Sequence, residues 1–190
     1  MRLPMTRLAS LVLVLLVALL HGCALNAPAY SPDASGIERA RNSGIRPAAL
    51  GSFSVKPGAT GGNSIGLRGS PMTSPVGNDY AAYLAEALRV ELQLAGKLDP
   101  ASPLEISGQL LSNDIAAGGF STNSGHIEAS FVVKRGGQTR YEAVKRAEAT
   151  WDSSFVGAVA IPRAVQQYPV LVQQLIGKLW ADPAFIAALQ

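Results

Sequence analysis

Few side chains of this 190-residue chain have the type and spacing needed for chemistry. Cys23 is the only cysteine, which leaves no disulfide within the chain but one thiol open to modification. Ser153 and Ser154 directly follow Asp152, yet a serine nucleophile needs a base held beside it, and none is near in the sequence. We therefore interpret these serines as loop residues that form local hydrogen bonds.

His126 has no second histidine or cysteine near it with which to share a metal ion. It stands at the start of a predicted strand, on the face opposite Ile127, which indicates a surface residue. The carboxylates are scattered and form no close pair at predicted core positions, so acid–base catalysis of the glycosidase kind has no support. We expect no enzyme activity, no metal and no cofactor.

The residues before Cys23 explain its position. Arg2 and Arg7 precede an apolar run over residues 8–20, and Gly22 stands just before the cysteine. A basic start, a short apolar stretch and a small residue at the cleavage point are typical of a secretory signal peptide. The run is shorter than the roughly 20 apolar residues of a membrane-spanning helix. We therefore expect residues 1–22 to be removed as a signal peptide rather than retained as an anchor helix.

The segment Leu20–Cys23, "LHGC", resembles the lipobox of bacterial lipoproteins, in which the cysteine is acylated and the chain is cut just before it. His21 departs from that pattern, because a small residue usually stands there. The resemblance implies a membrane anchor of palmitate-type chains on Cys23, where each buried methylene contributes about 0.8 kcal/mol. Ala24, rather than Asp, follows the cysteine, and the sorting rule for such lipoproteins then implies the outer membrane, with the body facing the periplasm.

The charge balance argues against a nucleic-acid partner. Residues 1–22 hold two of the 16 Lys and Arg residues, so the mature chain keeps 14 against 13 Asp and Glu. It is nearly neutral, and it has no run of basic residues with interleaved aromatics. Its length suits one compact domain.

The composition divides the mature chain into two parts. Residues 23–48 are rich in Ala, Ser, Pro, Gly and Asn without sustained periodicity, which predicts a lipidated N-terminus followed by a flexible tether. Ile37 and Ile45 are the residues of this part most suited to pack on the rest. Residues 49–190 are expected to form a single domain.

Hydrophobic periodicity predicts an α+β fold for that domain. Alternation favours strands at residues 50–58, 104–112, 126–135 and 139–151, and a period of 3.6 favours helices at 78–95 and from 163 onward. Pro169 is expected to kink the last helix or to mark its start, and residues 59–77 and 152–162 are expected to be loops. We expect a mostly antiparallel four-stranded sheet with two helices packed on one face.

Two loop aromatics are candidate partner-binding residues. Phe120 lies near the middle of the long connection at residues 113–125, and Phe155 lies in the loop after the last strand. An exposed aromatic on a loop can anchor a partner, but it can equally tuck under its own hairpin. The sequence leaves both alternatives open.

The chain from about residue 50 to its end resembles the YajG-type family of bacterial lipoproteins. The resemblance rests on "LEISGQLLSNDI", on the hairpin ending in "ATWDSSFVGAVAI", and on the terminal helix ending in "LWADPAFIAAL". The layout of that family is similar to that of the LptE-type lipoprotein that assists lipopolysaccharide assembly. The resemblance implies a compact α+β domain and carries over no catalytic or ligand residues.

These features predict a non-enzymatic lipoprotein that assists envelope assembly or maintenance by binding an envelope protein. One alternative is a carrier of a lipid or glycan in an apolar cleft between helices and sheet, suggested by Val132 and the apolar loop "SFVGAVAI". Another alternative is a structural lipoprotein associated with peptidoglycan. The sequence names neither partner nor pathway.

Overall fold

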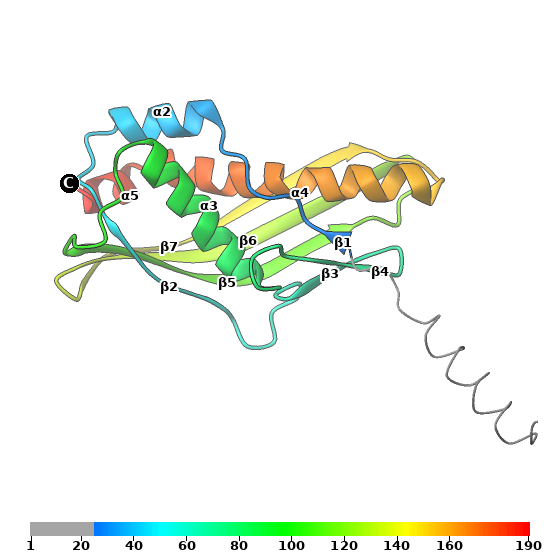
Figure 1. The fold of residues 1–190 in the computed structure, drawn as a ribbon, viewed down its shortest axis with the longest axis horizontal. Helices are drawn as coiled ribbons and strands as arrows, with labels where there is room; N and C mark the ends of the chain where they lie inside the picture. The colour runs from blue at the N-terminus through cyan, green and yellow to red at the C-terminus, as the bar shows by residue number, and fades with distance from the viewer. Residues whose placement is uncertain (1–24) are drawn as a thin grey trace, which may run out of the picture.

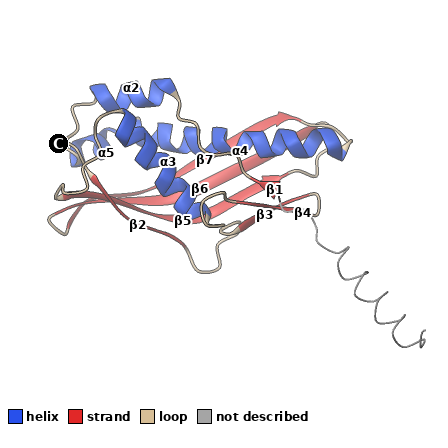
Figure 2. Cartoon of the chain, viewed as in Figure 1, coloured by secondary structure: helices blue, strands red, loops and turns tan. Residues whose placement is uncertain are grey.

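The computed structural model describes residues 25–190, so the predicted signal peptide and Cys23 lie outside the described residues. The predicted α+β class is confirmed, with helices and two sheets in one body (Figures 1 and 2). In chain order the elements are β1 (Leu25–Asn26), α2 (Ala34–Asn42), β2 (Ala49–Val55), β3 (Ser64–Leu67), β4 (Ser70–Thr73), α3 (Tyr80–Leu94), β5 (Leu104–Ala116), β6 (Thr122–Arg135), β7 (Gln138–Asp152), α4 (Gly157–Trp180) and α5 (Pro183–Ala188).

The large sheet has four strands in the order β2-β5-β6-β7, which correspond to the four predicted strands. It is mixed, because β2 pairs with β5 in parallel while the other two pairings are antiparallel. The parallel pair follows from the chain order: α3 lies between β2 and β5, and a crossover helix joins parallel neighbours. Gly108 of β5 leaves room for the ring of Phe53 on β2, since a Cβ atom there would lie 2.6 Å from Phe53 Cε1.

A second, three-stranded sheet has the order β1-β4-β3. Strands β3 and β4 form an antiparallel hairpin, and β1 pairs with β4 in parallel. The sequence analysis expected a loop over this region, because four-residue strands are too short for alternation to stand out. Ile65, Leu67 and Met72 nevertheless bury their side chains completely or nearly so.

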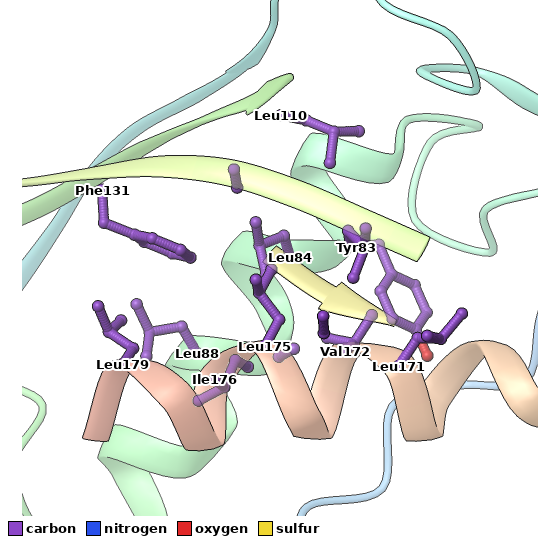
Figure 3. Packing of buried hydrophobic residues seen from close by; sticks show 14 of the residues in the cluster. Tyr83, Leu84, Leu88, Leu110, Phe131, Leu171, Val172, Leu175, Ile176 and Leu179 are labelled. Carbon is purple, nitrogen blue, oxygen red and sulfur yellow. The ribbon is translucent and has the colours of Figure 1, made fainter. Parts of the chain in front are cut away.

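The helices lie on one side of the large sheet, and α3 and α4 contact it directly (Figures 1 and 2). Helix α4 runs without interruption from Gly157 to Trp180. The expected loop over residues 152–162 is therefore confirmed only at residues 153–156, and Pro169 does not mark the start of the helix. The buried face is continuous across both prolines, and its burial explains why the helix persists through them. Figure 3 shows Phe131, Leu175 and Leu179 facing one another between sheet and helix.

The N-terminal segment packs on the domain instead of forming the tether that its composition suggested. Helix α2 contacts both α3 and α4. Ala27, Ala40, Ile45 and Ala48 are buried, and Ile37 packs against the core from a partly buried position. Alanine side chains are small and contribute little to a hydrophobic pattern in a sequence. They nevertheless let the backbone of the N-terminal segment approach the helices closely.

A buried carboxylate holds this segment in place. Glu91 on α3 accepts hydrogen bonds from the Tyr30 hydroxyl and from Trp180 Nε1, the latter at 2.5 Å, so it joins the N-terminal segment, α3 and α4. Burial raises the pKa of Glu91, although the two donated hydrogen bonds act in the opposite direction. Keeping the Glu91 carboxylate ionised in this buried position costs free energy. The hydrogen bonds from Tyr30 and Trp180 partly offset that cost.

Lys145 interrupts the apolar face of β7, and the structure gives it a partner there. Its ammonium lies 2.5 Å from Asp182, which also accepts from the Tyr141 hydroxyl at 2.7 Å and from the Ala184 N–H at the start of α5. The hydrogen bonds from Lys145 and Tyr141 lower the pKa of Asp182 to about 2. The charged pair thereby fastens the C-terminal helix to β7.

The buried carboxylate makes a pH dependence testable with Glu91→Gln. Because folding raises the pKa of Glu91, the wild-type protein loses stability from this group as the pH rises above about 4.5, the ordinary value. The variant lacks that loss, so its free energy of unfolding should increase relative to wild type between pH 4 and pH 8. Denaturant unfolding across this range measures the difference.

Glu86→Gln on the same helix is the matched control. Arg89 lowers the pKa of Glu86, so this variant should lose stability relative to wild type as the pH rises, which is the opposite sign. If the free energies of unfolding of wild type and Glu91→Gln changed in parallel with pH, the predicted cost of ionising the buried Glu91 carboxylate would be contradicted.

Candidate functional site

The candidate site is built around the tight turn between β3 and β4. Arg68 and Gly69 have φ values of 51° and 85°, so both central residues of this two-residue turn lie in the left-handed region. Such hairpin turns favour Asn or Gly, because a side chain at positive φ costs roughly 1–2 kcal/mol. An arginine here indicates that favourable interactions of its side chain offset the cost of this backbone conformation.

The Arg68 guanidinium binds four backbone carbonyl oxygens. Nε donates to Ala117 at 2.7 Å and Nη2 to Gly119 at 2.8 Å. Nη2 also donates to Ser154 and Nη1 to Phe155, each at 2.8 Å. A planar guanidinium with five N–H donors suits such a cluster. Arg68 thus fastens the β5–β6 loop and the β7–α4 loop to the small sheet.

Phe120 and Phe155 project from these two loops and stack on each other. Their ring centroids lie 5.4 Å apart with planes 1° from parallel, and the side chains remain 71% and 72% exposed. Val156 and Val159, at the start of α4, are also exposed. We call Phe120, Phe155, Val156 and Val159 the aromatic patch. Of the two alternatives left open by the sequence, the structure shows exposed rings rather than rings tucked under their loops.

The loop that carries Phe120 has a fixed shape. A Cβ atom on Gly119 would lie 1.7 Å from the Thr122 carbonyl oxygen, so only glycine fits there. The Gly119 N–H also donates to Asn123 Oδ1 at 3.1 Å. With the Arg68 bond to the same residue, these constraints hold the neighbouring ring in an exposed position although its apolar surface would favour burial.

The other candidates of the sequence lie in different places. Ser154 Oγ accepts from the Val156 N–H at 3.1 Å, as expected for a loop serine, and Ser153 Oγ is buried. His126 does not approach them. It lies on the sheet face opposite the helices, where its Nε2 is 2.8 Å from Ser112 Oγ on the neighbouring strand. The sequence analysis missed this pair because only strand register brings the two residues together.

His126 borders a pocket of about 320 Å³ whose lining also includes Arg146 and Glu148. Glu148 stands opposite His126 in the strand register, but its carboxylate accepts from Arg146 Nε at 2.6 Å. A triad requires a carboxylate that orients the histidine, and within residues 25–190 no such hydrogen bond to His126 is present. The arrangement forms a polar surface network.

No group of three or more His, Cys, Asp or Glu residues within residues 25–190 could hold a metal ion. Over the same range no helix has the length and apolar character required to cross a bilayer.

Arg68 is the principal site residue that the sequence analysis did not single out. Its signal was weak, because an Arg-Gly pair is not among the preferred hairpin turns and the strands on either side have only four residues.

The chain was compared with known proteins by sequence and by structure. No family model matches it, and no curated protein matches its sequence. Its structure is similar to that of a Xanthomonas campestris protein of the family DUF330, with a TM-score of 0.53 and 11% identity over 87% of this chain and 96% of that one. A Caulobacter crescentus protein described as a candidate lipoprotein gives a TM-score of 0.46 and 12% identity over 80% of this chain and 96% of its own. At this identity, the Xanthomonas structure shows a shared fold.

Removal of the guanidinium should release both loops. We expect Arg68→Ala to cost about 2–3 kcal/mol in the free energy of unfolding, because charged hydrogen bonds to four carbonyls are lost, three of them half-buried and the one to Phe155 exposed. Amide exchange should accelerate in residues 117–121 and 153–156, measured by mass spectrometry of peptides.

Arg163→Ala, an exposed arginine on the first turns of α4, serves as the control and should leave exchange in both loops unchanged. Equal protection of the loops in Arg68→Ala and wild type would show that Arg68 does not hold them.

Proposed function

We propose that this chain is a lipoprotein anchored in the outer membrane through Cys23, and that its folded body, facing the periplasm, acts as a non-enzymatic accessory that binds an envelope protein. The anchor rests on the leader and on the lipobox resemblance. The fold supports it by starting early: β1 begins at Leu25, where Leu25 pairs with Met72 and the Ala27 N–H donates to Thr73 O at 2.9 Å. The first described strand therefore begins two residues after the proposed acylation site.

The observation that carries protein binding is the open face of the large sheet. Strands β5, β6 and β7 have 13, 14 and 15 residues, and the helices lie on the other side (Figure 1). At about 3.3 Å per residue and 4.8 Å between strands, this face measures roughly 45 by 14 Å. Its area is comparable to the roughly 800 Å² per partner of a stable protein interface.

The chemistry of the open face also fits a protein partner. Val144, which is 54% exposed, pairs with Ser130, and Val132 pairs with Glu142, so the two valines are diagonal neighbours on the face. Charged side chains surround them, including the ion pairs of Arg146 with Glu128 at 3.4 Å and with Glu148 at 2.6 Å. An apolar centre with a polar rim is the usual anatomy of a protein interface.

A carrier of lipid or glycan is less well supported. The space between helices and sheet, where the sequence analysis placed an apolar cleft, is filled by side chains such as Phe131 and Leu175 (Figure 3). A pocket of about 300 Å³ lies elsewhere, beside Tyr30, Val76, Tyr83 and Val90. That volume is at the lower limit for a small-molecule site. A copurifying lipid detected by native mass spectrometry would favour the carrier.

The anchor is tested with Cys23→Ala. The variant lacks the sulfur that would carry the acyl chains, so we expect it to leave the membrane fraction, whereas wild type should sediment with outer membranes. Intact-mass analysis of wild type should show residues 1–22 removed and acyl chains added. A wild-type protein with a bare thiol would refute the anchor.

The open face is tested by photocrosslinking in living cells. A photoreactive residue at Val144 should give one discrete protein adduct, and the same residue at Leu94, which is half exposed on α3, should not. Adding Val132→Asp to the Val144 crosslinker should reduce the adduct several-fold, because the substitution places a charge in the apolar centre. Equal adducts from both positions, or an adduct insensitive to Val132→Asp, would contradict a specific interface.

A further inference from the structure

We propose that the aromatic patch contacts the bilayer that holds the anchor, so that the rings of Phe120 and Phe155 enter the interface between headgroups and acyl chains. This inference rests on the proposed acylation of Cys23. It adds a second membrane contact, made by side chains of the folded body, and it assigns the patch to lipid rather than to a protein.

The direction of β1 places the anchor at the same end as the patch. Leu25 pairs with Met72 and Asn26 with Thr73, so β1 and β4 run parallel. The N-terminal end of β1 therefore points toward the start of β4, next to the Arg68–Gly69 turn. Cys23 is two residues before Leu25, and two residues of chain span at most about 7 Å.

The same turn reaches the backbone beneath both rings. Arg68 donates to Phe155 O and to Gly119 O, the residue before Phe120. Figure 1 shows the β3–β4 turn, the β5–β6 loop and the start of α4 at one end of the elongated molecule, away from the C-terminus. A membrane reached within two residues of Leu25 therefore lies close to the aromatic patch.

The size and chemistry of the patch fit a lipid interface. Two phenylalanines that bury about 200 Å² each when covered leave roughly 280 Å² of exposed aromatic surface at the observed exposures. That area is well below the roughly 800 Å² of a typical protein interface. Phenylalanine is one of the residues with which interfacial segments insert about 5–10 Å into the headgroup boundary.

The helix behind the patch supports the same orientation. Helix α4 starts beside Val156 with no acidic residue in its first turn and no side-chain cap. Its N-terminal end carries a partial positive charge, which is favourable near the phosphates of lipid headgroups. The patch and the helix end would thus meet the acyl and phosphate layers of the same bilayer.

The test uses the full-length lipoprotein with a fluorescent probe. Once Cys23 is acylated, the chain has no other thiol, so Phe120→Cys introduces the only free one. We label it with an environment-sensitive fluorophore and reconstitute the protein into vesicles of phosphatidylethanolamine with a minority of phosphatidylglycerol. Val144→Cys on the open face is the matched control.

We expect the probe at position 120 to show blue-shifted emission and several-fold stronger quenching by nitroxide-labelled lipids than the probe at position 144. A second variant, Phe155→Cys, should behave like the first, since the two rings are stacked. Equal, weak quenching at positions 120 and 144 on an acylated protein would overturn the bilayer contact alone. Intact-mass analysis that finds Cys23 unmodified would instead overturn the anchor and the contact that rests on it.

A protein partner at the patch would give a different result. The probe at position 120 would then remain in water on pure lipid vesicles and become protected only in native outer-membrane vesicles, and that outcome would also overturn the bilayer contact.

Discussion

The guanidinium of Arg68 connects parts of the chain that are otherwise separate. Through one side chain, a hairpin of two four-residue strands binds the loop between β5 and β6 and the loop that enters α4. The turn that positions this arginine requires an unfavourable backbone conformation. The hydrogen bonds from this charged donor together outweigh that cost. The position of both exposed rings follows from this balance.

The sequence predicted the elements whose periodicity extends over many residues. All four strands of the large sheet and the helix at 80–94 could be placed, because alternation and the 3.6-residue period report burial directly. The small sheet was missed since short strands leave too few residues to show a period. The start of helix α4 was placed too late, because residues 157–162 were assigned to a loop although Ala160 shares a buried face with Ala164 and Tyr168. The sequence singled out both exposed phenylalanines as candidate binding residues. Their stacking and their common contact with Arg68 depend on the tertiary fold and could not be predicted from the sequence.

The packed N-terminal segment bears on how the proposed anchor would hold the folded body. A flexible tether would let the domain rotate freely above a membrane, whereas a chain that enters a sheet at Leu25 and is fixed again through Tyr30 and Glu91 restricts that rotation. With the aromatic patch on the bilayer, as we propose, the long strands point away from the membrane (Figure 1). The open face then stands toward the periplasm, where an envelope protein can reach it.

The inward-facing Lys145 also has a consequence for how copies of this protein coexist. Strand β7 ends the large sheet, so its outer backbone groups could template the addition of another strand. A half-buried cation that is neutralised by Asp182 of its own chain makes that border a poor match for a foreign or identical strand. Anchored molecules are confined to a plane and meet far more often than molecules in bulk solution. The lysine thereby offers protection against edge-to-edge polymerisation under the crowding that the proposed lipid anchor would impose.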